Sequence, residues 1–269
     1  MYNRDYKHLS QIDVKNVHVA IHGEYNNKPN IHMHVMHSDG RSTQIAIVTP
    51  ACTTHWPRCT GNGNLGTKFA PSDPMKAKYT LDLADDDIDG APCSGFKALA
   101  EFFNDLDDKL LDLVFNNQEK CLGGRRNLSI QECAMLQNRT VKPKYDSITG
   151  SLIGHSMHLS RPKFYKDPST GKYTETQVNI CDHKGTVIPD AKVQQGDVVC
   201  ATVYLSNVYT GVSDKFGISW GFEDVCIVRQ SSATNQKSHI PVFGENLYSF
   251  ATPYSNVTFD EMEWKSDNF

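Results

Sequence analysis

The stretch from residue 196 to residue 228 constrains the fold of this 269-residue chain more than any other part. Its β-branched and aromatic residues recur at every second position, the pattern of strands whose successive side chains point to opposite faces. Three strand runs are predicted, over residues 197–206, 216–220 and 225–227, with a turn over residues 210–214. Because the loops between the runs are short, neighbouring runs are expected to pair in antiparallel fashion.

Strand signals elsewhere in the chain repeat this pattern. Before residue 90 they cover residues 17–22, 31–37, 43–49 and 77–84. They resume at residues 156–164, and a hairpin with its tip at residues 166–172 leads into residues 174–182. Residues 1–11 are expected to form a polar arm, residues 50–74 a long loop, and residues 138–146 a basic, proline-containing connection.

Two helices are predicted between these strands. Residues 94–115 have one apolar stripe with the helical period of 3.6 residues, formed by Phe96, Leu99, Phe103, Leu106, Leu110 and Val114. Ser94 is the expected N-cap, and acidic side chains fill the opposite face. Residues 128–136 are expected to form a second, short helix that is capped by Asn127 or Ser129.

The net charge of −4 conceals a strong asymmetry along the chain. Residues 73–119 hold 12 acidic and 4 basic residues, whereas residues 120–172 hold 10 basic and 3 acidic residues, a net charge of +7. A basic middle segment points to a polyanionic partner. There is no apolar run of membrane-span length, no secretory signal and no disulfide-framework spacing of the eight cysteines. A reducing, intracellular compartment is therefore expected, with no membrane partner.

Two motifs of catalytic type are present without their structural context. Residues 217–221 match G-x-S-x-G, in which Ser219 would be a hydrolase nucleophile at a sharp turn between a strand and a helix. Strand alternation continues through Ser219, so a serine hydrolase is the least favoured function. Residues 61–66 match G-x-G-x-x-G, but no strand precedes them and no helix follows, as a dinucleotide site would require.

Candidate metal ligands occur in two places. Three residues of the 50–74 loop and one further cysteine have the side chains that zinc prefers: Cys52, His55, Cys59 and Cys93. His32 and His34 share one face of a predicted strand, which could also suit a metal. Because the paired Cys-x-x-Cys knuckle is absent and solvated histidines are common, we predict no metal site and no cofactor. The role of the 50–74 loop stays open.

The basic middle segment also carries aromatic residues. Proteins that bind single strands need cations for the phosphates and rings on which bases stack. Tyr204, Tyr209 and Lys215, in or next to the long strand run, extend this set. The candidate nucleic-acid-binding residues are Arg139, Lys142, Lys144, Tyr145, Arg161, Lys163, Phe164, Tyr165, Lys166, Lys172, Tyr204, Tyr209 and Lys215.

Several features follow one another in order from residue 156 to residue 228. First, a strand leads into the motif FYKD (164–167), which is followed by a lysine-bearing hairpin tip and a second strand. Next come the motifs DHKG (182–185) and IP (188–189). The order ends with a glycine-led strand at residue 196 and the motif FGI (216–218). In this order the chain resembles the single-stranded DNA-binding protein of T7-like bacteriophages and its relatives in large DNA viruses of eukaryotes. The segment KPKYD (142–146), the helix from residue 94 and the acidic end closing on Phe269 are similar to features of that family.

This resemblance implies an OB-fold, a mainly β (α+β) antiparallel barrel with an inserted helix and, in this chain, extra N-terminal strands. Residues 1–230 would bind single-stranded DNA without sequence specificity in viral DNA replication or recombination, with no enzymatic activity. The location would be a host nucleus or a cytoplasmic viral factory, and a homodimer is allowed.

The resemblance also implies a role for residues 231–269, as a linker and a short acidic tail. The tail would compete with DNA and dock a polymerase, helicase or primase. Its expected partner-binding residues are Asp260, Glu261, Glu263, Trp264, Asp267 and Phe269. The tail is much less acidic than the phage type, and the first three strands have no counterpart in that family. A β-rich structural or virion-associated protein without nucleic-acid binding is the alternative.

Overall fold

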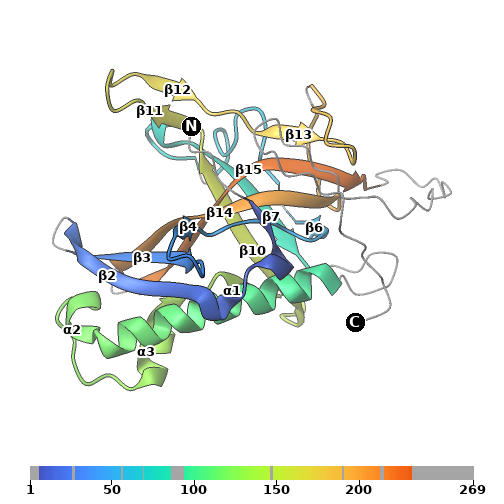
Figure 1. Cartoon of the computed structure of the whole chain (residues 1–269). Helices are drawn as coiled ribbons and strands as arrows, with labels where there is room; N and C mark the ends of the chain where they lie inside the picture. The colour runs from blue at the N-terminus through green and yellow to red at the C-terminus, as the bar shows by residue number, and fades with distance from the viewer. Residues whose placement is uncertain are drawn as a thin grey trace.

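Two 15-residue strands, β14 (Val198–Val212) and β15 (Lys215–Arg229), form the centre of the fold in the computed structural model of this chain (Figure 1). They pair in antiparallel fashion with four register shifts, and such bulges bend and twist a strand pair. The sequence predicted two separate runs where β15 is continuous. Gly221 of β15 makes room for the ring of Tyr204 on β14, because a Cβ atom at residue 221 would lie 2.4 Å from Cζ of that tyrosine.

The structure describes residues 6–25, 28–55, 57–68, 70–85, 94–145, 148–189, 191–212 and 215–231. Within these residues one ten-stranded sheet dominates, which confirms the mainly β class. Its hydrogen-bonded path runs through β1 (Lys7–His8), β5 (Ala46–Val48), β14, β6 (Cys52–Thr54), β7 (Lys78–Ala84), β10 (Leu152–Pro162) and β9 (Val141–Tyr145). On the other side of β14, β15 also pairs in parallel with β13 (Asn179–Cys181) and β8 (Gln137–Asn138).

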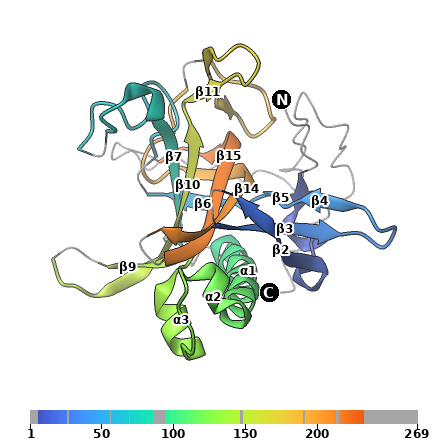
Figure 2. The ribbon, with the colours of Figure 1, turned by 90° about the vertical axis from the view of Figure 1, so that its left-hand side faces the viewer.

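The sheet is not closed into a ring by backbone pairing among the described residues. No ladder there joins β15 to β10, although the two strands are neighbours (Figure 2). Across this gap, Nη1 of Arg161 on β10 donates to the backbone carbonyl of Glu223 on β15 at 3.2 Å. Among the described residues, backbone pairing therefore does not close the barrel expected from the sequence, and the Arg161 side chain bridges the seam between β10 and β15.

Two smaller sheets flank the main one. β2 (Val17–Tyr25), β3 (Lys28–Met36) and β4 (Ser42–Gln44) form an antiparallel three-stranded sheet, and β11 (Phe164–Lys166) pairs with β12 (Tyr173–Glu175). The strand predicted over residues 43–49 is split at the buried Ile45, so that β4 and β5 belong to different sheets.

The pKa of His34 on β3 is lowered, mainly by burial of its ring and then by the charges of the neighbouring His18, His22 and His32.

Three segments that the sequence placed outside regular structure contribute strands to the main sheet. β6 lies in the predicted 50–74 loop, and β1 lies in the predicted polar arm. β9 occupies the predicted basic connection, where it is the last strand of the path. Proline is tolerated in such an edge strand because one side of the strand needs no N–H donors, so Pro143 does not interrupt β9. Each of these strands has at most five residues, too few to show a clear period.

The helices agree with the sequence more closely. α1 (Ser94–Asn116) begins at the predicted residue, and its predicted apolar stripe is buried; the N-cap position before it lies outside the described residues. α2 (Gln118–Cys121) is a short addition that was not predicted. α3 (Ile130–Leu136) is capped by Ser129, whose hydroxyl accepts from the N–H of Glu132 while the Glu132 carboxylate accepts from the N–H of Ser129. Within the described residues, none of the helices is long and apolar enough to cross a membrane.

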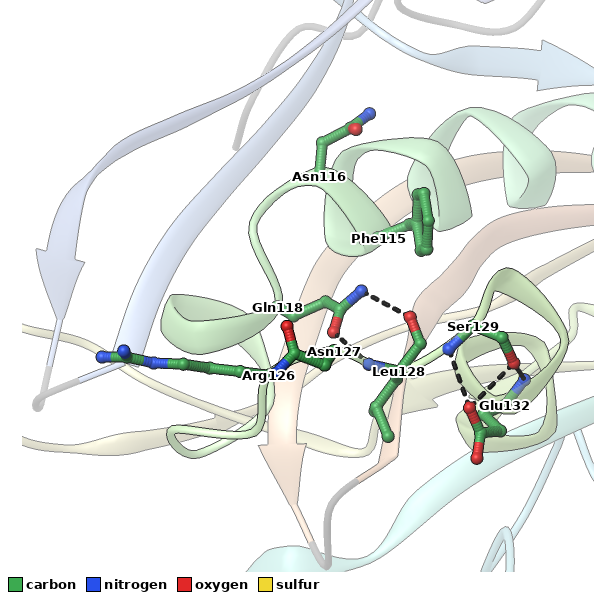
Figure 3. A pocket seen from close by; sticks show the side chains of 8 residues that line it. All are labelled: Phe115, Asn116, Gln118, Arg126, Asn127, Leu128, Ser129 and Glu132. Atoms are coloured by element: carbon green, nitrogen blue, oxygen red, sulfur yellow. Dashed lines mark hydrogen bonds between the residues drawn. The ribbon is translucent and has the colours of Figure 1, made fainter.

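An open cavity of about 620 Å³ lies between the end of α1 and the start of α3 (Figure 3). Most of its polar groups already bond to one another. The Gln118 side-chain amide donates to the carbonyl of Leu128 at 2.9 Å and accepts from its N–H at 2.8 Å. Arg126 forms an ion pair with Glu119. The polar groups around this cavity therefore hold the connection between α2 and α3 in place.

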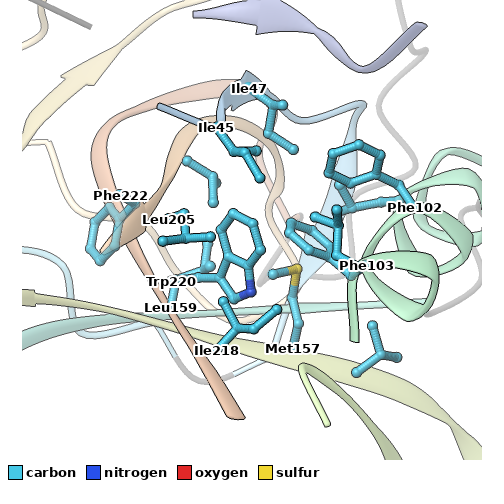
Figure 4. Packing of buried hydrophobic residues seen from close by; sticks show 14 of the residues in the cluster. Ile45, Ile47, Phe102, Phe103, Met157, Leu159, Leu205, Ile218, Trp220 and Phe222 are labelled. Atoms are coloured by element: carbon cyan, nitrogen blue, oxygen red, sulfur yellow. The ribbon is translucent and has the colours of Figure 1, made fainter. Parts of the chain in front are cut away.

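The hydrophobic core lies between α1 and the central strands. Figure 4 shows Trp220 of β15 facing Phe103 of α1, with Ile45 and Leu205 packed nearby. The rings of Trp220 and Phe103 meet edge to face, with centroids 4.4 Å apart. The seven described cysteines are buried and form no disulfide with one another. Cys200 and Cys226 lie in the central strands as small buried residues, and the Cys226 thiol also donates to the carbonyl of Asp182 at 2.9 Å.

A buried carboxylate connects α1 to β15 and to the start of β9. Asp107 accepts from the N–H of Thr140 at 2.7 Å and from its hydroxyl at 3.1 Å. The same hydroxyl accepts from the indole N–H of Trp220 at 3.0 Å. Burial raises the pKa of Asp107 from 3.8 to about 6, although the bonds from Thr140 oppose that shift.

The raised pKa of Asp107 predicts how stability depends on pH. The folded state holds the proton of the Asp107 carboxyl more tightly than the unfolded state does. The contribution of this proton to the free energy of unfolding is therefore complete below the unfolded pKa of 3.8 and is lost as pH rises through about 6. Urea unfolding of wild type between these pH values should show a falling free energy, and Asp107→Asn should flatten the slope. Asp105→Asn is the control, because the Asp105 side chain is exposed on the same helix. Equal slopes for wild type and Asp107→Asn would contradict this account.

Candidate nucleic-acid interface

β10 joins the two hairpins that carry most of the predicted interface residues. Its N-terminal end pairs with β9, and its C-terminal end leads directly into β11, so the hairpins lie at opposite ends of one strand (Figure 2). A strand rises about 3.3 Å per residue, so the 11 residues of β10 span roughly 35 Å. Cations and rings are therefore displayed at both ends of an extended surface.

The β11–β12 hairpin exposes two tyrosine rings next to lysine side chains. Tyr165 is 56% exposed and Tyr173 is 49% exposed. The ammonium group of Lys166 lies 5.8 Å from the ring centroid of Tyr173, within the range of a cation–π contact. At the tip, hydrogen bonds from Ser169 and Thr170 lower the pKa of Asp167 to about 2. Its carboxylate is thus used to hold the turn that carries Lys172.

The β9–β10 hairpin presents a second group of cations and apolar side chains. Lys142 is exposed, Lys144 is half-buried, and Tyr145 is 60% exposed. The exposed apolar side chains of Ile148 and Leu152 lie on the same hairpin. This group therefore combines charge with surface on which an unpaired base could pack.

The strand between the hairpins carries two carboxylate–histidine pairs. Nδ1 of His158 on β10 lies 2.6 Å from Oδ1 of Asp82 on β7. Oδ1 of Asp85 accepts from the backbone N–H of His155 at 2.6 Å. Nδ1 of the His155 ring lies 3.4 Å from Oδ2 of the same carboxylate. These two carboxylates, Asp82 and Asp85, are thus each paired with a histidine.

Three predicted residues lie near the start of β15 and bond to neighbouring elements. Arg139 forms an ion pair with Asp108 of α1 at 2.5 Å. The Tyr209 hydroxyl accepts from the side chain of Asn138 at 3.1 Å, and the ammonium group of Lys215 donates to the carbonyl of Met135 at 2.9 Å. Tyr209 and Lys215 thus attach β8 and α3 to the central strands, while Arg139 bonds to α1. A phosphate would have to compete with these bonds.

Lys163 does not fit a role in DNA binding. It is 6% exposed, and its ammonium group donates to the carbonyl of Gly61 at 3.0 Å and lies 3.4 Å from the Glu175 carboxylate. It also lies 5.9 Å from the ring centroid of Tyr79 and 5.7 Å from that of Phe164, which is half-buried. Lys163 thus attaches the β11–β12 hairpin to the segment around Gly61, and the predicted contact with phosphate is replaced by a structural one.

Tyr204 does not fit a stacking role either. It is 8% exposed and packs in a small apolar cluster with Tyr6, Ala46 and Val48. Tyr6 belongs to the segment that the sequence placed in a polar arm, and its hydroxyl donates to Glu223 at 2.5 Å. The N-terminal segment therefore covers the strand face on which the ring of Tyr204 lies.

The other predicted sites have the following outcomes. Ser219 lies in the middle of β15, opposite Asn207, and so lacks the turn that a nucleophile elbow needs. Burial raises the pKa of the Cys59 thiol to about 12, and in the described part of the chain no three His, Cys, Asp or Glu side chains are arranged to hold a metal. Cys93 and the tail residues from 260 to 269 lie outside the described residues. Tyr173 lies among the aromatic residues of the basic segment, next to Lys172, but was left out of the predicted binding residues.

The structural role of Lys163 predicts the effect of replacing it. Lys163→Met leaves the carbonyl of Gly61 without this donor and should lower the free energy of unfolding by about 1–3 kcal/mol. Lys172→Met is the matched control, because this lysine is exposed at the hairpin tip. Thermal and urea unfolding measure the difference. A Lys163→Met variant of wild-type stability would show that the buried ammonium group is not needed for folding.

Comparisons with known proteins find similarity only at the level of structure. No protein-family model matches the chain. No curated protein sequence matches it either. The chain is similar to gp2.5, a single-stranded DNA-binding protein encoded by bacteriophage T7, with a TM-score of 0.50 at 12% identity over 72% of this chain and 97% of that protein. The single-stranded DNA-binding protein of bacteriophage Enc34, in complex with single-stranded DNA, gives a TM-score of 0.39 at 10% identity over 79% and 96% of the two chains. The likeness to the T7 protein confirms the resemblance inferred from the sequence, as a likeness of fold.

Proposed function

We propose that this protein binds single-stranded DNA with little base preference, along β10 and the hairpins at its two ends. The observation that carries the proposal is the β11–β12 hairpin, where Tyr165 and Tyr173 are exposed and Lys166 lies over one of their rings. Exposed rings stack on bases of any kind, and lysines neutralise phosphates. The fold shared with the T7 protein, which is itself a single-stranded DNA-binding protein, supports the same function.

We also propose that the central sheet is an OB-type barrel. OB-folds are five-stranded, partly open barrels, which agrees with the seam between β10 and β15 that Arg161 bridges. An OB-fold holds roughly 4–16 nucleotides, and a surface of about 35 Å along β10 is long enough for the lower part of that range. In this proposal residues 1–230 form the DNA-binding unit.

The setting of this activity rests on the resemblance stated above. We propose that the protein acts in viral DNA replication or recombination, without catalysing a reaction itself, in a host nucleus or a cytoplasmic viral factory. The acidic residues 260–269 would compete with DNA for the cationic surface and would dock replication proteins when DNA displaces them.

A competition experiment tests the function. A labelled oligothymidylate should bind the full chain and be displaced by unlabelled single strands of mixed sequence, but poorly by duplex. Affinity should fall linearly with salt on a log–log scale, because each phosphate contact releases counterions. Equal competition by duplex, or an affinity that salt does not change, would contradict the proposal. A chain that binds neither competitor would favour the structural or virion-associated alternative.

The same assay tests the stacking residues. Tyr165→Ala or Tyr173→Ala should each cost about 1–3 kcal/mol of binding to single strands. Tyr165→Phe is the matched control, since it keeps the ring and removes only the hydroxyl. Thermal unfolding of each variant should match wild type, because both rings are largely exposed. Alanine variants that bind as tightly as wild type would exclude this hairpin from the interface.

Deletion of residues 260–269 tests the tail. This segment holds four acidic residues and one lysine. A tethered segment reaches an effective concentration on the order of millimolar, so a weak contact with the DNA site is enough to compete. The truncated chain should bind single strands more tightly at low salt, and the difference should shrink as salt rises. If neither DNA affinity nor binding of a replication partner changes, the tail has no part in this function.

A further inference from the structure

Four histidines lie together on the outer face of the β2–β3 hairpin. His18 on β2 is directly opposite His34 on β3, and their ring centroids are 5.4 Å apart. The rings of His22 and His32 form a second cross-strand pair, with centroids 4.9 Å apart. His32 and His34 are two residues apart on one strand and so share a face, and we call the four residues the histidine patch. Figure 2 shows β2 and β3 on the opposite side of the molecule from β9.

The patch lies on the solvent side of its sheet. Ile31, Met33 and Val35 alternate with the histidines of β3 and are buried against the core. His18, His22 and His32 are exposed, and His34 is half-buried. The rings are therefore held close to one another by strand pairing, with room for an ion and its water above them.

The histidines of the patch differ from most others in the chain. In the described part of the chain their rings make no hydrogen bond, whereas the rings of other histidines do. His37 bonds to Thr43, His155 to Asp85 and His158 to Asp82. Four imidazoles held together without hydrogen-bond partners leave their ring nitrogens free to bind a ligand.

We propose that the histidine patch binds divalent transition-metal ions, one at the His18–His34 pair and one at the His22–His32 pair. A zinc–imidazole bond of about 2.0–2.1 Å puts the ring centre about 3 Å from the metal, so two rings at the tetrahedral angle on one ion are about 5 Å apart. The centroid separations of 5.4 Å and 4.9 Å agree with that distance. Small rotations of the side chains would then direct one nitrogen of each ring at a shared ion.

The number of protein ligands determines how readily a metal ion bound at these sites exchanges. No three ligand-type side chains are arranged around one metal position in the described residues, so each ion would keep water at its remaining positions. Such a site is exchangeable, unlike the closed four-ligand sites that hold small domains together. Imidazole suits zinc, nickel and copper, with the tightest binding for copper. Magnesium and calcium prefer oxygen ligands and should not bind here.

Titration of the full chain with nickel chloride in a calorimeter tests the proposal. Nickel is chosen because it prefers imidazole and, unlike copper(II), does not readily oxidise the buried thiols. Wild type should bind nickel but not magnesium, and metal binding to the native state should raise the melting temperature. His18→Gln/His34→Gln and His22→Gln/His32→Gln should each lose one site and keep the other. The quadruple variant should lose both sites.

The control variant is His155→Gln/His158→Gln, which removes two histidines that are held by Asp85 and Asp82. It should bind nickel as wild type does. Absence of nickel binding by wild type, or unchanged binding by the quadruple variant, overturns the proposal. If a double variant unfolds at a lower temperature, the single His18→Gln or His22→Gln variant replaces it for its own pair, because these exposed rings can be changed with little effect on packing. DNA binding is not part of this test, so its outcome is independent of the function proposed above.

Discussion

The burial of one carboxylate between a helix and two strands determines how the parts of this molecule fit together. Asp107 can lie in the core only because Thr140 donates two hydrogen bonds to it, and Thr140 in turn receives the indole N–H of Trp220. Buried polar groups are costly unless they are paired, so this network admits one relative position of α1, β15 and the start of β9. The cations of β9 are displayed where they are because the residue before that strand is fixed in this way.

The basic segment divides into two kinds of cation that composition alone cannot separate. Lys163 and Arg161 bond to backbone carbonyls of distant segments and hold elements together. Lys142 and Lys166 instead stand on hairpins that project from the ends of β10. A net charge of +7 over 53 residues, from 120 to 172, thus overstates the charge available to a polyanion. The exposed rings of the hairpins are the better guide to where a nucleic acid would lie.

Local periodicity explains what the sequence could predict about the fold. α1 was located closely because its apolar stripe repeats over six positions, and β7 because its alternation spans a whole strand. β6 and β9 were missed because strands of three and five residues carry little periodic signal and depend on pairing with β7 and β10. The same limit applies to the site. Nothing near Lys163 in the sequence reveals Gly61, and nothing near Tyr204 reveals that Tyr6 covers it.

The composition of β9 has a consequence for how this sheet ends. The last strand of an open sheet presents unpaired backbone groups that can template the addition of a strand from another molecule, which is a route to aggregation. Natural proteins blunt such edges with lysine and proline, and β9 has Lys142, Pro143 and Lys144 in succession. The side chains that we assign to phosphate binding thus also discourage the sheet from growing. Selection for nucleic-acid affinity and selection against self-assembly would therefore favour the same residues at this edge. A variant with apolar side chains on β9 would bind DNA more weakly and would also aggregate more readily.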